Sequence, residues 1–515
     1  MTRVSRFALL TSLLTALPAP AAEPAKESAP DNAGLFKLVT ASWLGGPFDD
    51  ELVAAAIAPD GTIILAGNGV ELPFPAVTPA VIGPAGAFDK AAAPPPPDPK
   101  KKGQPKWRHP STHGFVVRLA ADGQKVLGLT RFGYGSATVR KMHLDAAGNI
   151  FLLADVSQEI ALGDSPASKG TVIATLSPDG TKLTRAVWHA DALDFGVDGN
   201  GEIVVLTKAK MTRYAADGKS QKWAVTWKSH GDNRPGGMAV SPDTGVAAVT
   251  GYGMTHTGKE PYKDPYAYGF DRDGKPAWAL WNPDPAKEKD VKFSGAELKT
   301  NGLMADTTGR GVGTGANGKV FVTLYADGGN SVCTRDPADV DQPLAKGVFA
   351  GVFQGGPGYG FKGASKTAVV FRLDAKTGTL EKGTWLCAWK DKAHANSLGI
   401  DATAADAQGR QFLTGNSAFG CPTKDPWYAC AEGGYQGGGY LAVMDRDFKM
   451  LQCGYFPAAG LTCVAARGGT VVVAGNAKRY EDEEKKVDAR VFQPLQKTFG
   501  GGDKDGYFAV FRAGK

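Results

Sequence analysis

The sequence predicts an all-β fold built from many short strands, and three observations support this prediction. Of the 515 residues, 68 are Gly and 33 are Pro, so about a fifth of the chain consists of residues that interrupt helices. Turns that contain Asp and Gly recur between short segments of alternating apolar residues, as in antiparallel hairpins. The hydrophobic fraction of 43% and the charged fraction of 21% indicate a globular chain, because disordered chains have too few apolar residues to form a core.

The first residues predict an export signal. Arg3 and Arg6 precede a short apolar segment, and Ala19-Pro20-Ala21 matches a signal-peptidase site. No later segment has the roughly 18 consecutive apolar residues of a membrane-spanning helix. The formal net charge of +6 is too small to predict binding to nucleic acid. We therefore expect a signal peptide at residues 1–21, a flexible mature N-terminus at 22–34, and a single domain at 35–515 that is periplasmic or extracellular.

Two classes of turn alternate along the chain and define a repeat. The first class comprises Asp60-Gly61, residues 145–148, 198–201, 243–245, 306–309 and 406–409, and Gly468-Gly469. The second class comprises Asp122-Gly123, Asp179-Gly180, Asp217-Gly218, Asp273-Gly274, and residues 374–378 and 445–447. Each unit is then strand a, tight turn, strand b, variable loop, strand c, tight turn and strand d. In the fifth unit, Asn317-Gly318 is an alternative position for the a–b turn.

The chain ends predict how the seven units are arranged. The last unit has a strand c at residues 506–511 but no room for a strand d before the chain stops. An apolar segment at residues 35–44 precedes the first unit and has no other partner. Pairing the two closes a ring without open ends, whereas a linear solenoid would need capping repeats. We therefore predict a seven-bladed β-propeller of four-stranded blades, with the last blade completed by the N-terminal strand.

Short motifs in the first unit also resemble a known repeat. In order they are Trp43-Leu44-Gly45-Gly46, Asp49-Asp50-Glu51, residues 56–61, residues 64–67, Phe74-Pro75 and residues 114–119; Phe499-Gly500-Gly501 and residues 506–511 repeat the last part. This pattern resembles the bacterial β-propeller repeat called SBBP. Units 2 and 3 lack the double Asp and the Phe-Pro, and later units keep mainly the turns. The resemblance implies an exported propeller, and it carries no catalytic residues.

The longest segments between strands are all b–c loops, at residues 68–113, 326–366, 417–438 and 478–505. Insertions confined to one face of a repeat array are typical of a binding face, although long loops also tolerate insertion passively. Aromatic residues in these loops suit contact with a protein or a polysaccharide, or else pack down on the blade. The candidates are Trp107, Trp427, Tyr428 and Tyr435. We expect a monomer that binds a partner through this face.

A second candidate site is the rim of the central channel, which the d–a connections approach. The polar candidates there are Asp50, Arg140, Asp191, Arg234, Glu297, His394 and Asn396. A ring of carboxylate and amide oxygens is able to hold Ca²⁺, and this would suit a metal-dependent hydrolase or lyase at the channel mouth. The other interpretation is that these residues are polar caps on the inner strands. Arg140 and Arg234 favour it, because their charges would oppose a bound cation. No other cofactor is predicted.

The six cysteines all lie between Cys333 and Cys463. Cys421 and Cys430 share one polar, Gly-rich loop, so we predict a disulfide between them, and the pairing of the other four stays open. Residues 313–319 match the phosphate-loop pattern, but Val320 replaces its Ser or Thr. No H-E-x-x-H or G-x-S-x-G motif occurs. The sequence therefore predicts an exported, non-catalytic propeller that acts as a binding or structural interaction module.

Overall fold

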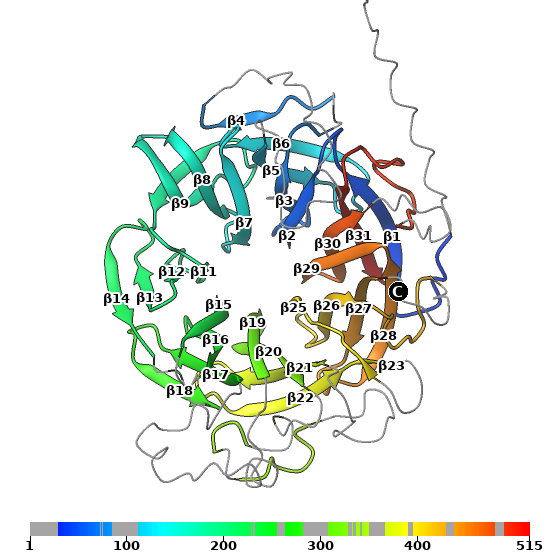
Figure 1. The fold of residues 1–515 in the computed structure, drawn as a ribbon. Helices are drawn as coiled ribbons and strands as arrows, with labels where there is room; N and C mark the ends of the chain where they lie inside the picture. The colour runs from blue at the N-terminus through cyan, green and yellow to red at the C-terminus, as the bar shows by residue number, and fades with distance from the viewer. Residues whose placement is uncertain are drawn as a thin grey trace, which may run out of the picture.

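The described residues form seven sheets of four or five strands arranged around a central axis (Figure 1), together with one two-stranded sheet. The computed structural model describes residues 29–72, 74, 76–84, 112–227, 229, 232–254, 263–281, 307–327, 332, 336–339, 342–349, 366–389, 395–428, 437–478 and 489–514. In each of the seven larger sheets the first strand lies next to the axis and the last strand lies at the circumference. The predicted seven-bladed propeller of four-stranded blades is confirmed. None of the described residues forms a helix that is long and apolar enough to cross a membrane.

The blades follow the chain in order, and their strands are named here from the axis outward. Blade 1 contains β2 (Glu51–Ile57), β3 (Ile63–Gly69), β5 (His113–Leu119) and β6 (Val126–Phe132), with β4 (Ala80–Ile82) added outside β6. Blade 2 contains β7 (Ala137–Leu144), β8 (Ile150–Leu162), β9 (Ser165–Leu176) and β10 (Leu183–Trp188). Blade 3 contains β11 (Asp194–Val197), β12 (Ile203–Leu206), β13 (Met211–Tyr214) and β14 (Gln221–Val225).

The remaining blades repeat this order. Blade 4 contains β15 (Arg234–Val240), β16 (Ala247–Met254), β17 (Lys263–Phe270) and β18 (Pro276–Leu280). Blade 5 contains β19 (Thr307–Gly315), β20 (Lys319–Asp327), β21 (Lys366–Asp374) and β22 (Leu380–Leu386), and a small pair, β23 (Ala388–Trp389) with β24 (Ala395–Asn396), follows it. Blade 6 contains β25 (Ala402–Ala405), β26 (Gln411–Ser417), β27 (Gly438–Met444) and β28 (Met450–Pro457). Blade 7 contains β29 (Ala459–Arg467), β30 (Thr470–Lys478), β31 (Lys504–Ala513) and β1 (Phe36–Leu44).

Blade 7 joins the two ends of the chain. Strand β1 pairs antiparallel with β31, from Phe36 opposite Ala513 to Leu44 opposite Gly506. The predicted closure by the N-terminal strand is therefore confirmed. A ring closed in this way leaves no unpaired blade at either end, so it needs no capping repeat.

The tight turns explain the recurrence of Asp and Gly. In the first turn, Asp60 Oδ1 accepts a hydrogen bond from the Thr62 backbone N–H at 2.9 Å, and Gly61 has a φ of 84°. The turn of blade 5 lies at Asn317-Gly318, where φ is 61° and 66°, and not at residues 306–309. Asn and Gly adopt a positive φ more readily than other residues, which explains their place in this turn. Gly309 lies inside β19 instead.

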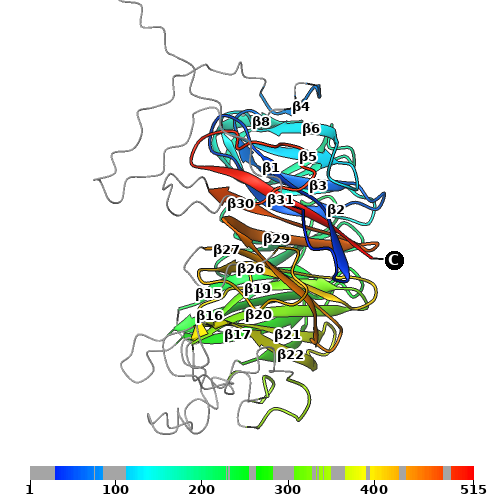
Figure 2. The same ribbon diagram turned by 90° about the vertical axis from the view of Figure 1, so that its right-hand side faces the viewer.

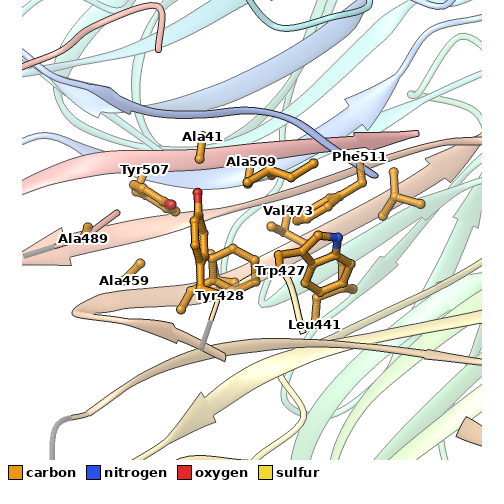
Figure 3. Close-up of a cluster of buried hydrophobic side chains, with 14 of the residues drawn as sticks. Ala41, Trp427, Tyr428, Leu441, Ala459, Val473, Ala489, Tyr507, Ala509 and Phe511 are labelled. Carbon is orange, nitrogen blue, oxygen red and sulfur yellow. The ribbon is translucent and has the colours of Figure 1, made fainter. Parts of the chain in front are cut away.

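The core lies between neighbouring blades. Along β31, Tyr507 and Phe511 belong to the cluster shared with blade 6, whereas Phe508 and Val510 belong to the cluster shared with blade 1. This division follows from the period of two along a strand, which points successive side chains to opposite faces. Figure 3 shows the first of these clusters, in which Trp427 lies beside Phe511. Each blade therefore stabilises its two neighbours through both faces of its sheet.

Candidate functional site: the loop face and the channel mouth

The strand order gives the propeller two faces of unequal connection length. Figure 2 shows the ring edge-on between them. One face, the turn face, carries the a–b and c–d turns. These range from two residues, 468–469, to six residues, as at 120–125. The other face, the loop face, carries the b–c and d–a connections. Its longest b–c connections are residues 70–112, 328–365, 418–437 and 479–503.

Described parts of the four long b–c connections return to the outer edge of their own blade. In blade 1, β4 pairs in parallel with β6. Isolated bridges do the same in the other three blades: Phe349 with Gly383 of β22, Lys424 with Cys453 of β28, and Phe492 with Ala41 of β1. An uncovered outer strand presents unpaired backbone groups, which invite pairing with another chain. These connections therefore protect the sheet edges as well as extending the loop face.

Trp427 and Tyr428 are buried rather than displayed on the loop face. Trp427 is 0% exposed and Tyr428 is 3% exposed. The indole N–H of Trp427 donates to the Phe36 carbonyl at 2.7 Å, and its ring lies 4.5 Å from that of Phe511. The guanidinium of Arg490 lies 5.1 Å from the centre of the Tyr428 ring. Of the two interpretations of these aromatic residues, packing on the blade is the one that the structure shows. Trp107 and Tyr435 lie outside the described residues.

Three Asn side chains fasten neighbouring blades at the loop face. Each stands at the end of a strand b, directly after a Gly, and its Oδ1 accepts from a backbone N–H of the next inner strand. The pairs are Asn68 to Val139 at 2.7 Å, Asn476 to Leu52 at 2.8 Å, and Asn416 to Leu461 at 3.1 Å. In each case the inner strand has a register shift just after the donor, so the bulge frees an N–H that the neighbouring blade satisfies.

The Gly before each of these Asn residues has a steric reason. A Cβ at Gly67 would lie 2.0 Å from the Glu51 carbonyl oxygen, and one at Gly475 would lie 1.8 Å from that of Gly460. Strands a and b therefore approach too closely for any side chain at this point. The Gly-Asn pair is thus a local signature of the blade-to-blade contact.

Two charged side chains near the channel mouth, Arg140 and Lys141, have partners in blade 2 and blade 3. In blade 2, the bulged residue Arg140 lies with Nε 3.2 Å from Asp155 Oδ2, and its Nη2 donates to the Ala192 carbonyl. The neighbouring Lys141 binds Asp194 of blade 3, with Nζ 2.5 Å from Oδ1. The positive charges of Arg140 and Lys141 are therefore neutralised by carboxylates, and two of these contacts join blade 2 to blade 3. This is the arrangement expected of polar caps on inner strands.

The other predicted rim residues are spread around the ring. Asp191 is exposed in the turn before blade 3, with a φ of 59°, and Arg234 is exposed at the first position of blade 4. Asn396 pairs with Ala388 in the small sheet before blade 6. Glu297 and His394 lie outside the described residues. Among the residues that the structure describes, no three His, Cys, Asp or Glu side chains lie close enough together to hold a metal ion.

Asp50 lies not at the open rim but in the seam between blades 7 and 1, where it is 1% exposed. Its Oδ2 accepts from the Gly46 backbone N–H at 2.6 Å. Burial raises the pKa of Asp50 well above its ordinary value, and the charges of Asp505 and Asp49 raise it further. A carboxyl group in this position serves to hold the Gly45-Gly46 loop. Asp50 is therefore not placed to bind a metal ion at the channel mouth, as the hypothesis of a metal-dependent enzyme would require.

The described cysteines give one close pair. Cys421 Sγ lies 3.9 Å from Cys453 Sγ. Cys430, its predicted partner, lies outside the described residues, and so does Cys333. Burial raises the pKa of Cys387 to about 12 and that of Cys463 to about 11, so both thiols stay protonated.

Sequence reasoning missed two exposed apolar side chains on the loop face. Val81 of β4 is 47% exposed, and Leu193, just before β11, is 46% exposed. On the turn-face side, Leu127, near the start of β6, is 44% exposed. Val81 lies within a loop whose pairing with β6 has no local signal, and Leu193 lies in a connection of mixed polarity. Their exposure depends on the fold and is not encoded by the neighbouring residues.

No family model and no curated protein matches the chain. Similar solved structures include a chain of the mitotic checkpoint complex, with 9% identity, a TM-score of 0.38, and coverage of 92% of this chain and 95% of that one. BamB from Moraxella catarrhalis has 8% identity, a TM-score of 0.35, and coverage of 77% and 91%. The Cps50 (Swd1) β-propeller domain of Myceliophteria thermophila has 8% identity, a TM-score of 0.38, and coverage of 78% and 91%.

Proposed function

We propose that this protein is an exported, non-catalytic β-propeller that binds a protein partner through its loop face. The observation that carries the proposal is the inequality of the two faces. Every described turn on the turn face is at most six residues long, whereas all the long b–c connections leave from and return to the loop face. In repeat folds, such one-sided elaboration accompanies binding on the elaborated side.

The exposed apolar side chains favour a protein as the partner. Val81 and Leu193 lie on the loop-face side and expose nearly half of their surface. Buried apolar anchors supply much of the affinity of protein interfaces, whereas a polysaccharide is held largely by stacking on aromatic rings. Trp427 and Tyr428 are buried and so offer no such ring. A polysaccharide partner is therefore the second candidate, and it would depend on Trp107 and Tyr435.

The test uses substitutions matched between the two faces. The mature protein is cross-linked in an extract of the cell that produces it, the captured protein is identified, and its affinity for purified variants is measured. We expect Val81→Asp and Leu193→Asp each to weaken binding by at least about tenfold. Leu127→Asp places the same charge at an equally exposed apolar position on the other side, and we expect it to bind as the wild type does.

Other outcomes would contradict the proposal. Equal affinity of all the variants would exclude these two positions from the interface, and loss of binding only in Leu127→Asp would assign the interface to the turn face. Selective retention on immobilised polysaccharide, with no protein captured, would favour the second candidate. Light scattering of the purified protein tests the expectation of a monomer.

Export is part of the same proposal and has its own test. The proposal is supported by the charged N-terminus, the short apolar segment and the Ala19-Pro20-Ala21 site, and by the resemblance of the first unit to the SBBP repeat. We expect the mature protein to begin at Ala22, because cleavage follows the Ala19-Pro20-Ala21 site. N-terminal sequencing of the protein recovered from the producing cell measures this directly. Recovery of a chain that still begins at Met1 or Thr2 would contradict export by cleavage.

A further inference from the structure

Two cysteines of blade 6 meet at the base of its long b–c connection. Cys421 lies four residues after the end of β26, and Cys453 lies in the outer strand β28. Their sulfur atoms are 3.9 Å apart. They would have to approach each other by about 1.9 Å to reach the length of an S–S bond, about 2.0 Å. The two thiols come from segments 32 residues apart in the sequence. Their contact is therefore a product of the fold.

The backbone near this pair is already fixed. Lys424, three residues after Cys421, forms an antiparallel bridge with Cys453. The Lys424 N–H donates to the Cys453 carbonyl at 3.0 Å, and the Cys453 N–H donates to the Lys424 carbonyl at 2.8 Å. The loop segment and the strand therefore hold the two cysteines side by side before any covalent bond forms.

The two sulfurs differ in their access to solvent. Cys453 is 0% exposed, whereas Cys421 is partly exposed. A small disulfide reagent therefore reaches Cys421 first. This order suits thiol–disulfide exchange, in which an accessible thiolate attacks the reagent and a neighbouring thiolate completes the reaction.

We propose that Cys421 and Cys453 form a disulfide that clamps the blade 6 connection onto the outer edge of its blade. The Cys421 thiolate attacks a low-molecular-weight disulfide such as glutathione disulfide, which forms a mixed disulfide and releases one glutathione thiolate. The Cys453 thiolate then attacks Cys421 Sγ and displaces the second glutathione. Two protein thiols lose two protons and two electrons, and one glutathione disulfide is reduced to two thiols. In the cell, the bond rests on the export proposed above.

The clamp would act on the closure of the ring. The segment next to Cys421 ends in Trp427, whose indole binds the Phe36 carbonyl of β1. Gln452, beside Cys453, accepts from the Phe36 N–H at 2.8 Å and donates to the Phe36 carbonyl at 3.2 Å. Both sides of the proposed bond therefore lead to the N-terminal strand that completes blade 7. Fixing them together would hold that strand against blade 6.

The test is a map of the thiols in the full chain. The purified, reduced protein is treated with glutathione disulfide, alkylated in denaturant and digested. We expect a peptide pair linked through Cys421 and Cys453, with a mass about 2 Da below the sum of the reduced peptides. Cys421→Ser should leave no peptide linked to Cys453, and Cys453→Ser should leave Cys421 as its mixed disulfide with glutathione, because the thiol that displaces the glutathione is missing. Cys463→Ser removes a buried thiol elsewhere and should leave the linked pair intact.

Cys430→Ser separates the two pairings that concern Cys421. If Cys421 bonds to Cys453, the linked peptide persists in this variant. If Cys421 bonds to Cys430, as the sequence predicts, Cys421 in Cys430→Ser is linked to no cysteine peptide and carries glutathione instead, and this result would overturn the proposal. Alkylation of both Cys421 and Cys453 after oxidation of the wild type would overturn it as well. A bond that forms in the purified protein but is absent from protein recovered from the cell would instead count against export.

Proteolysis tests whether the bond acts as a clamp. We expect cleavage by thermolysin within residues 422–428 to be at least about fivefold slower in the oxidised than in the reduced wild type, because opening of this segment is restricted. Cys421→Ser and Cys453→Ser should be cleaved at the same rate with or without the oxidant. Equal cleavage of oxidised and reduced wild type would refute the clamp even if the bond forms.

Discussion

Asp50 and Asp505 lie buried on the two sides of the seam between the last blade and the first, and each carboxyl group holds a Gly-Gly loop. Asp50 Oδ2 accepts from the Gly46 N–H at 2.6 Å, and Asp505 Oδ2 accepts from the Gly500 N–H at 2.5 Å. The two loops lie against each other, since a Cβ at Gly500 would lie 2.3 Å from the Gly46 carbonyl oxygen. The Gly and Asp motifs from both ends of the chain thus meet at one structural joint.

The first prediction concerns the pH dependence of this joint. Burial raises the pKa of Asp505 to about 7. The hydrogen bond from Gly500 lowers this pKa but does not cancel the effect of burial, and the negative charge of Asp49 raises it further. Because this pKa is raised in the folded state, the stability that the protonated group contributes is present below the unfolded pKa of 3.8 and is lost as the pH rises to about 7. The full shift corresponds to ~4 kcal/mol as an upper limit.

Asp505→Asn imitates the protonated carboxyl group at every pH. We expect this variant and the wild type to have the same free energy of unfolding at about pH 4. At about pH 8 the variant should be the more stable of the two by at least ~1 kcal/mol. Urea unfolding at a series of pH values measures the difference. Asp503→Asn changes an exposed carboxylate two residues away and should show no such trend. A difference between Asp505→Asn and the wild type that stays constant with pH would contradict the prediction.

The second prediction concerns Trp427 as an anchor of the ring closure. Its side chain is fully buried against Phe456 and Phe511, and its N–H binds the Phe36 carbonyl. Trp427→Ala leaves a large cavity and should lower the free energy of unfolding by ~3–5 kcal/mol. Trp427→Phe keeps part of the volume but leaves the buried carbonyl with one hydrogen bond fewer, and should cost ~1–3 kcal/mol. Denaturant unfolding measures both.

Trp223→Phe is the matched control for the lost indole hydrogen bond. The Trp223 N–H donates to the Arg272 carbonyl at 2.8 Å in an exposed position, where water replaces the missing donor. We expect a smaller loss of stability than in Trp427→Phe. Equal losses in the two Phe variants would show that Trp427 does not anchor the closure through its N–H.

The third prediction concerns the Asn side chains that join neighbouring blades. Asn68→Ala would leave the buried Val139 N–H without its acceptor, and we expect a loss of ~1–3 kcal/mol. Asn476→Ala should have a similar effect at Leu52, in a different seam. Leu52 pairs with Gly67, next to Asn68, so the two contacts are neighbours in space, but they join different pairs of blades and the double variant should be less stable than either single one. Urea unfolding of the three variants tests this, and a double variant no less stable than either single one would contradict it.

The sequence predicted the architecture well because the turns carry local chemical signals. A left-handed backbone position in a hairpin favours Gly, so a turn such as Asp60-Gly61 is visible without any tertiary information. The unpartnered strand at each end of the chain then required a closed ring. The sequence left two positions open for the a–b turn of blade 5, because Gly309, Gly311, Gly313 and Gly315 alternate within β19 and imitate turn residues. There the glycines reflect close packing of the inner strands, as at Gly309, where a Cβ would lie 2.5 Å from the Gly251 nitrogen.

The candidate sites were harder to predict because their contacts join distant residues. The ion pair of Lys141 with Asp194 spans 53 positions, and the hydrogen bond of Trp427 with Phe36 spans 391. An aromatic residue in a Gly-rich loop has the same local sequence whether it faces solvent or fills a seam. Burial of Trp427 is decided by the neighbouring blade and the N-terminal strand, neither of which is near it in the sequence.

The last prediction concerns a charged cluster buried in blade 3. Arg213 is 0% exposed; its Nε lies 2.7 Å from Glu202 Oε2, its Nη2 contacts Asp198, and its Nη1 donates to the Gly245 carbonyl of blade 4 at 2.7 Å. Arg213→Met would leave the fully buried Asp198 carboxylate with far less compensation. Because an uncompensated buried charge is costly, we expect the free energy of unfolding of this variant to be lower than that of the wild type by ~3–5 kcal/mol at about pH 7.

The same cluster gives that loss a characteristic pH dependence. Burial alone would raise the pKa of Glu202, but hydrogen bonds from Lys222 and Arg213 lower it overall, so its contribution to stability is present above the unfolded pKa of 4.5 and is lost as the pH falls through the folded value. The difference in free energy of unfolding between the wild type and Arg213→Met should therefore narrow as the pH falls below 4.5. Lys222→Met removes a partly exposed partner of Glu202 and should cost at most ~1 kcal/mol. Urea unfolding at about pH 7 compares the two variants. If Arg213→Met were no less stable than Lys222→Met, the guanidinium of Arg213 would not be what stabilises the buried carboxylates of Asp198 and Glu202.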